Sequence, residues 1–200
     1  MFSLQFQTVM DFIPETLQWT KCDDTSNVQV IPHTGLVFII NSFANGTDYN
    51  QRIGRVINMK AIRIRFSVAP TPASDMADQR IRILLVLDHH SNSLASTTIT
   101  DVLQFASTLA PENNSSRLRF VILKDWLFQL SRLDVANGLM SDASFVAEDI
   151  YMKLDIPAVY GSTSGLVAPE SGALYLMAIT SVAALNPTLS FTTRMYFTDS

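Results

Sequence analysis

The chain has 200 residues, 48% of them hydrophobic and 16% charged, with a formal net charge of −4 and one cysteine, Cys22. This length suits a single domain with an ordinary core, and one cysteine excludes an internal disulfide. No run of 18 apolar residues occurs, so the sequence predicts no transmembrane helix and no membrane partner. The charged fraction lies below the roughly 25% of an average soluble domain, which makes contacts with other subunits the simplest cover for part of the surface.

Strand patterns dominate the chain. Residues 37–41 form a short β-branched run, and residues 56–69 alternate from Lys60 onward, with apolar side chains on one side and arginines on the other. Residues 80–88 start with alternation and become apolar on both faces, which is typical of a central strand covered on both sides. Further strands are predicted at residues 117–124, 126–130, 151–160, 173–182 and 189–198.

Only one helix is predicted, a short one over residues 100–106 with Thr98 or Thr100 as its N-cap. Loops rich in glycine, proline, asparagine and serine separate the strands, and no repeat or linker divides the chain. About eight strands with almost no helix predict an all-β fold, an eight-stranded antiparallel jelly-roll sandwich.

The most prominent candidate for catalysis is the triplet Asp88, His89 and His90, which follows an apolar strand. A strand followed by Asp-His-His resembles the signature of the DHH phosphoesterases, which bind two metal ions. A two-metal site needs further carboxylate and histidine ligands, and His33 is the one other histidine in the sequence. An aspartate that caps a turn at the end of the strand explains Asp88 without catalysis.

Other catalytic chemistry has little support in the sequence. Asp23 and Asp24 directly follow Cys22 and would raise the pKa of its thiol, and no Gly-x-Ser-x-Gly motif is present. We therefore predict that the protein is not an enzyme and uses no cofactor. Structural Ca²⁺ between subunits remains an open alternative, because acidic residues in several predicted loops are suitable ligands. These residues are Asp75, Asp78, Asp134, Asp142, Glu148 and Asp149.

Basic residues are concentrated in the middle of the chain. Residues 52–124 contain ten basic and five acidic side chains, whereas the rest contains four basic and thirteen acidic ones. Three Arg-x-Arg pairs are each expected on one face of a strand, and clustered strand ends would form a phosphate-binding surface without base readout. The alternative is that each arginine pairs with a loop carboxylate or lies in a subunit contact. No run of aromatic residues interleaved with lysine or arginine is present. The candidate nucleic-acid-binding residues, expected on an inner face, are Arg52, Arg55, Lys60, Arg63, Arg65, Arg117 and Arg119, and the third pair is Arg80 and Arg82.

Seven segments carry a family resemblance. Residues 50–62, NQRIGRVINMKAI, resemble the NQRIG-x-x-I-x-x-K-x-I segment of capsid proteins from small circular Rep-encoding single-stranded DNA viruses. The satellite-necrosis-virus-like branch of these viruses is the most similar. Six more segments resemble the family motifs in the same order: residues 80–88, 100–103, 119–125, 153–157, 172–179 and 194–199.

The resemblance implies a coat subunit that assembles with copies of itself into a small icosahedral shell, located in the virion and in the host cell during assembly. Such proteins usually carry a basic N-terminal arm that neutralises packaged phosphates. Residues 1–14 contain no lysine or arginine, so they are interpreted as the remnant of an arm, and residues 15–200 as the jelly-roll domain. We accordingly expect the protein to hold little nucleic acid. The alternative function is a non-viral jelly-roll module that binds a glycan or a protein through aromatic residues, with Trp19, Trp126 and Tyr160 as candidates.

Overall fold

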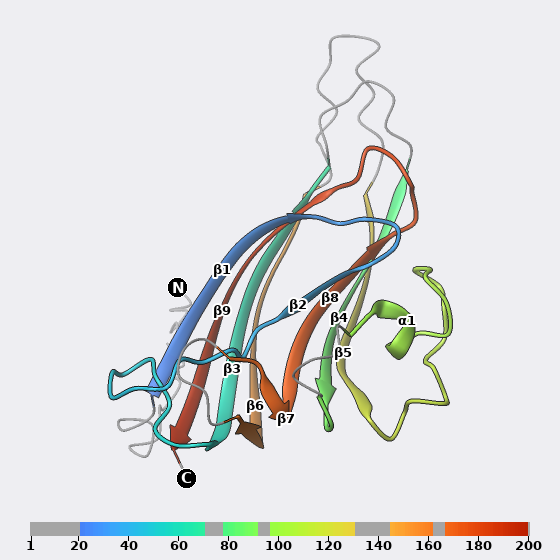
Figure 1. Cartoon of the computed structure of the whole chain (residues 1–200). Coiled ribbons are helices and arrows are strands. Elements are labelled where there is room, and N and C mark those ends of the chain that lie inside the picture. Colours follow the sequence, from blue (N-terminus) through green and yellow to red (C-terminus); the bar gives the residue numbers. More distant parts are fainter. Residues whose placement is uncertain (1–20, 71–77, 92–96, 131–144, 162–166, 200) are drawn as a thin grey trace, which may run out of the picture.

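The computed structural model describes residues 21–70, 78–91, 97–130, 145–161 and 167–199 (Figure 1). This part of the chain contains nine strands and one helical turn, α1 (Ile99–Val102). None of the described helices is long and apolar enough to span a membrane. The strands are β1 (Lys21–Val30), β2 (Leu36–Ile39), β3 (Val56–Ala69), β4 (Gln79–Asp88), β5 (Phe120–Leu130), β6 (Val146–Tyr160), β7 (Pro169–Ser171), β8 (Ala173–Thr180) and β9 (Thr188–Asp199).

The strands form two antiparallel sheets that pack against each other (Figure 1). The five-stranded sheet has the order β1-β9-β3-β6-β7, and the four-stranded sheet has the order β2-β8-β4-β5. Without β7, the eight remaining strands have the orders 1-8-3-6 and 2-7-4-5, which is the arrangement of a jelly roll. The predicted fold class is therefore confirmed. One feature is additional, since the three-residue β7 extends the first sheet beside β6.

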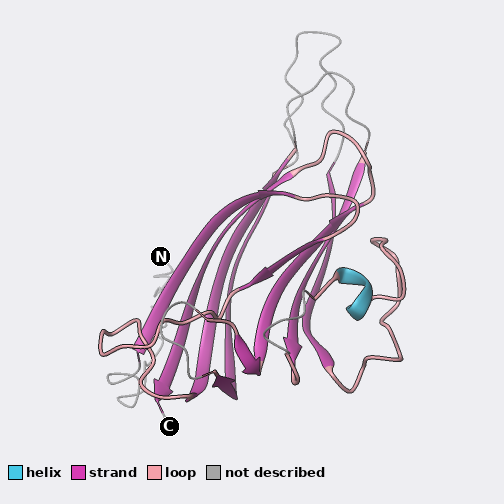
Figure 2. Cartoon of the chain, in the orientation of Figure 1, coloured by secondary structure: helices cyan, strands magenta, loops and turns pink. Residues whose placement is uncertain are grey.

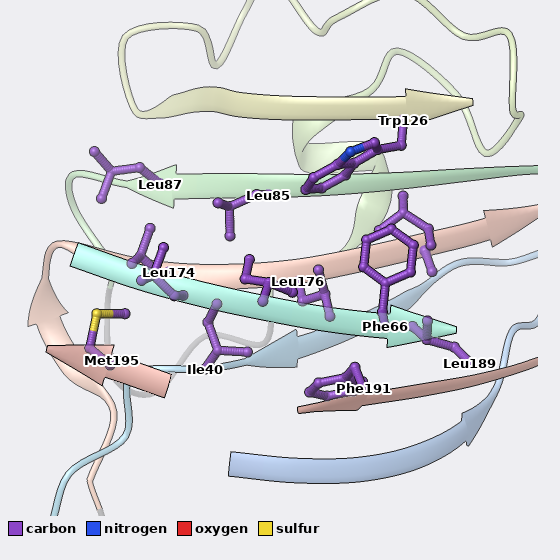
Figure 3. Packing of buried hydrophobic residues seen from close by; sticks show 14 of the residues in the cluster. Ile40, Phe66, Leu85, Leu87, Trp126, Leu174, Leu176, Leu189, Phe191 and Met195 are labelled. Atoms are coloured by element: carbon purple, nitrogen blue, oxygen red, sulfur yellow. The ribbon is translucent and has the colours of Figure 1, made fainter. Parts of the chain in front are cut away.

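The main core lies between the two sheets, where the inward side chains of both layers meet (Figure 3). Phe66 of β3 packs edge-on against Trp126 of β5, with ring centroids 5.4 Å apart. An irregularity in pairing lies between Met59 and Ala61, so that one extra residue is accommodated at Lys60. Because of it, Met59 before the bulge and Ile62 after it are both fully buried, although an uninterrupted strand would turn them to opposite faces.

A second core covers the outer face of the four-stranded sheet. Residues 97–119, which include α1, lie against this face, and Ile99, Val102 and Leu103 are buried there. Figure 2 shows the helical turn beside the strands β4 and β5. This second layer explains why β8 is buried at all eight positions and why β4 is apolar on both faces near its end. The prediction of a central strand covered on both sides is confirmed.

Three sequence predictions need correction. The predicted strands at 117–124 and 126–130 are one strand, β5, and it begins at Phe120 because the preceding residues form turns closed by the carbonyl of Ser116. The helix is shorter than predicted, with Thr98 as N-cap, whose backbone N–H donates to the Asp101 carboxylate at 2.7 Å. Strand β1 was not predicted. Residues 1–14, which were interpreted as an arm remnant, lie outside the described residues.

Candidate nucleic-acid interface

The outer face of the five-stranded sheet, turned away from the four-stranded sheet, holds three of the predicted basic residues. The register of β1, β9, β3 and β6 arranges the side chains of this face in rows of directly opposed residues. Successive rows contain Cys22, Tyr196, Ala61 and Lys153; then Asp24, Arg194, Arg63 and Tyr151; then Ser26, Thr192, Arg65 and Asp149; and then Val28, Ser190, Ser67 and Ala147.

Two arginines of β3 share one carboxylate of β6. Arg63 donates from Nε and Nη2 to the two oxygens of Asp149 at 2.8 and 2.7 Å, and Arg65 donates from Nε to the same carboxylate at 2.9 Å. These bonds lower the pKa of Asp149 from 3.8 to about 2, and hydrogen bonding by Arg63 contributes most to this shift. One carboxylate cannot neutralise two guanidinium groups, so this part of the face keeps an excess positive charge.

Two further ion pairs lie on the same face. Lys60 donates from Nζ to Asp155 at 2.7 Å, and this bond lowers the pKa of the Asp155 carboxyl. Asp155 itself has a positive φ of 64°, a conformation that aspartate tolerates better than most residues. Arg194 of β9 binds Asp24 of β1 with two bonds at 2.7 and 2.6 Å.

Aromatic rings lie among these charges. Tyr151 of β6 is half exposed, and its ring centroid lies 6.4 Å from that of Tyr196 on β9, with the rings at 64° to each other. Arg63 faces both Tyr151 and Arg194 in the register. No continuous run of aromatic and basic residues marks this group in the sequence, because its members belong to the strands β3, β6 and β9. The sheet register brings the three strands together, and within a strand Arg194 and Tyr196 share this face because they are two residues apart.

A shallow hollow of about 470 Å³ adjoins the charged rows. Its lining side chains on the outer face are short, so the surface is low here. Arg65 and Asp149 stand at its border next to the charged row. Four residues with hydroxyl groups, Ser26, Ser67, Ser190 and Thr192, are among those that line it.

The other predicted basic residues do not join this face. Arg52 is 1% exposed and lies over the ring of Tyr160 at 4.7 Å, with Nη2 donating to the carbonyl of Gly161 at 3.3 Å. Its guanidinium is thus inside the protein. Arg55 binds the Tyr160 carbonyl at 3.0 Å and the Glu170 carboxylate at 3.4 Å, near the end of β6.

The Arg117 and Arg119 pair was expected on one face of a strand, and this expectation is wrong. Both residues precede β5 and lie in its leading turns. Arg117 is exposed, whereas Arg119 turns back to bind Asp88 with two bonds at 2.9 and 2.8 Å. The structure therefore gathers Lys60, Arg63 and Arg65 and leaves the other four candidates elsewhere. Nucleic-acid binding by any of them stays a prediction.

The triplet at the end of β4 has a structural explanation. Asp88 is fully buried and accepts the backbone N–H of His90 at 3.0 Å, which confirms its predicted role as a turn cap. The side chains of His89 and His90 are exposed. Among the described residues, no group of three or more histidines, cysteines, aspartates or glutamates is placed to hold a metal ion. Three of the candidate Ca²⁺ ligands, Asp75, Asp134 and Asp142, lie outside the described part, so the Ca²⁺ alternative stays untested.

The arginines find their carboxylate partners mainly on neighbouring strands instead of in loops. Asp24, Asp125 and Asp149 belong to β1, β5 and β6. The uneven distribution of charge along the sequence is thus largely balanced across adjacent strands. The aromatic candidates for glycan binding are also placed inside, since Trp126 is 9% exposed and Tyr160 is fully buried, while Trp19 lies outside the described residues.

Comparison with known proteins finds similarity among solved structures. No family model and no curated protein matches the chain. The chain is similar to one in a solved structure of Broad Bean Stain Virus, with a TM-score of 0.40, 10% identity, and coverage of 90% of this chain and 88% of that one. A chain of Desmodium yellow mottle tymovirus gives a TM-score of 0.35 at 10% identity, with the same coverage of 90% and 88%. A chain of infectious bursal disease virus, Gx strain, gives 0.15 at 9% identity, covering 89% of this chain and 40% of that one. The jelly-roll assignment rests on the strand order and register described above.

Proposed function

We propose that this protein is a viral coat subunit that assembles with copies of itself into a small icosahedral shell. The observation that carries the proposal is that the family-like sequence segments contact one another in the folded chain. They occupy the entry to β3, then β4, α1, the start of β5, the middle of β6, β8 and the end of β9. The resemblance therefore extends over α1 and six of the nine described strands.

Specific bonds join these segments in pairs. Asp88, in the second segment, binds Arg119 in the fourth and accepts, through its carbonyl, the N–H of Gly172 in the sixth at 3.0 Å. The backbone N–H of Ile53, in the first segment, donates to the Asp199 carboxylate in the last at 2.8 Å. A chance match of separate short motifs would not place their polar residues as partners of each other. This pattern supports the finer proposal of a relation to the satellite-necrosis-virus-like branch.

Self-assembly is supported by apolar side chains that neither core uses. Leu118 is 88% exposed, and Phe105 and Leu109 in the same covering segment are 53% and 58% exposed. Leu127 on β5, a strand with no neighbour on its outer side among the described strands, is 52% exposed. Exposed apolar side chains that form a contiguous patch mark contact surfaces in soluble proteins. We propose that these side chains form a contact between neighbouring copies of the chain in the shell of the virion.

The proposal is tested by comparing the assembly of two variants with that of the wild type. Leu118→Asp places a charge in the proposed contact, whereas Tyr49→Asp alters a side chain that is 73% exposed in a separate loop. Burying a leucine contributes roughly 2 kcal/mol, so we expect Leu118→Asp to shift the protein toward free subunits in size-exclusion chromatography. Tyr49→Asp should elute as large particles, like the wild type. Equal assembly of all three proteins would refute this contact, and a wild type that stays monomeric across pH and salt would refute the coat function.

A further inference from the structure

We propose that the outer face of the five-stranded sheet binds single-stranded nucleic acid, with bases stacked on Tyr151 and Tyr196 and phosphates held by Arg63, Arg65 and Lys153. The inference rests on the proposed function in one respect: the bound strand lies inside the shell, so this face is assigned to the shell interior. It goes beyond that function by naming the binding surface and how it recognises its ligand.

The two tyrosines provide the stacking surface. Tyr151 is half exposed on the outer face, and Tyr196 lies beside it in an edge-on arrangement. Stacking of a base on an aromatic ring contributes about 1–3 kcal/mol and tolerates any base, because every base has a π face. Unpaired bases are needed for such stacking, and this requirement favours a single strand over a duplex.

The basic residues around the tyrosines are placed to bind phosphates. Arg63 and Arg65 share the single carboxylate of Asp149, and Lys153, in the row next to Tyr151, is exposed and forms no ion pair within the described chain. The face has five basic side chains and three acidic ones, so it is positive although the whole chain has a net charge of −4. The basic side chains are Lys60, Arg63, Arg65, Lys153 and Arg194, and the acidic ones are Asp24, Asp149 and Asp155.

The hollow beside Arg65 extends this surface with hydroxyl groups. Thr192 lines it in the row of Arg65, and Ser67 and Ser190 line it in the next row toward the end of the sheet. Serine and threonine hydroxyls, like arginine and lysine, are common partners of phosphate and sugar oxygens. A sugar–phosphate backbone can therefore run along the strands from the tyrosines, past Arg65, into the low part of the surface.

Binding at this face should depend strongly on salt. Four of the five basic groups are paired with carboxylates on the same face, and a phosphate has to compete with these carboxylates. Contacts of this kind lose affinity steeply between about 50 and 200 mM salt, since binding releases condensed counterions. We therefore expect measurable binding at low salt together with little nucleic acid retained in particles purified at moderate salt.

The test measures fluorescence anisotropy of labelled single-stranded DNA and RNA of mixed sequence with the full-length protein, under conditions where chromatography shows free subunits. Where shells do not dissociate, the nuclease-protected strand content of the particles is measured instead. Tyr151→Ala and Arg65→Ala should each weaken binding at least about fivefold. Tyr151→Phe, which keeps the ring, should bind like the wild type.

Matched controls separate the face from general charge effects. Arg80→Ala removes an exposed arginine from β4 of the other sheet, and Tyr49→Ala removes an exposed tyrosine from a loop. Both should bind within about twofold of the wild type, and a duplex should bind more weakly than a single strand. The inference is overturned if the wild type does not bind at low salt, if the controls lose as much affinity as the face variants, or if the duplex binds equally well. Normal particles without binding would refute this inference alone, whereas binding without any particles would refute the coat function alone.

Discussion

Individual ion pairs in this protein link positions that are distant in the sequence. Asp88 is fully buried at the end of β4, and its main partner, Arg119, approaches from a turn before β5. The turn-capping role of Asp88 could be predicted from its place after an apolar strand, because capping is local. The partner could not be predicted, since the path of residues 113–119 depends on hydrogen bonds with the α1 region.

Removal of Arg119 should destabilise the fold strongly. In Arg119→Ala, the Asp88 carboxylate remains buried without its counter-charge, and such losses typically cost about 3 kcal/mol. Arg117→Ala, two residues away and exposed, is the matched control and should change stability by less than about 0.5 kcal/mol. Urea unfolding of both variants measures the difference. Equal stabilities would show that the pair with Asp88 contributes nothing.

A second prediction at this scale concerns Gly172, at the start of the sixth family-like segment. Gly172 has φ +75°, and a Cβ atom there would lie 2.3 Å from the carbonyl oxygen of Pro157. Gly54 has a similar φ of +80° but nothing within 4 Å of its Cβ position, so it isolates the cost of the backbone conformation. We expect Gly54→Ala to cost about 1 kcal/mol and Gly172→Ala about 2 kcal/mol more. Thermal unfolding that ranks them in the other order would contradict the close approach.

The strands differ in how well they can be predicted from their sequences. The bounds of β3 were predicted without error, because its interior positions are apolar and its outer positions polar. In β1 the half-buried positions are polar, from Lys21 to Gln29, whereas the exposed ones include Val28 and Val30. This edge strand is held by ten paired positions along β9, so its formation depends on a neighbour at the other end of the chain.

Pairing between strands also makes stability depend on acid. The pKa of Asp149 is lowered from 3.8 to about 2 by its bonds to Arg63 and Arg65, and the pKa values of Asp24 and Asp155 are lowered as well. Carboxyls whose folded pKa lies below the unfolded value stabilise the fold above the unfolded pKa and lose that contribution as pH falls through the folded one. The loss should therefore fall between about pH 4 and pH 2.

The melting temperature measured against pH tests this dependence. The wild type should lose stability steeply in that interval, and Asp149→Asn should lose less because its amide does not titrate. Thr192→Asn, on the same face, is a control that keeps all three carboxyls and should follow the wild type. Identical pH profiles for the wild type and Asp149→Asn would show that the shared carboxylate does not contribute.

Over the whole molecule, the fold class was predictable and the arrangement of charge was not. Alternating strands with almost no helix are enough to indicate a β-sandwich, since few other architectures bury such strands. The sequence leaves open whether its basic middle region forms one positive surface or scattered charge. In the fold this region is divided, because β3 is the one strand of residues 52–124 that places basic side chains on the outer face of the five-stranded sheet. The candidate interface with Tyr151 and Tyr196 depends on the register of three strands.

Electron microscopy of the purified full-length protein tests the coat function most directly. The account predicts closed particles of uniform diameter with icosahedral symmetry, in which the jelly-roll domains form the shell and residues 105–118 lie at a contact between copies. A protein that remains a dispersed monomer at every pH and salt concentration tried, or that forms only irregular aggregates, would contradict it.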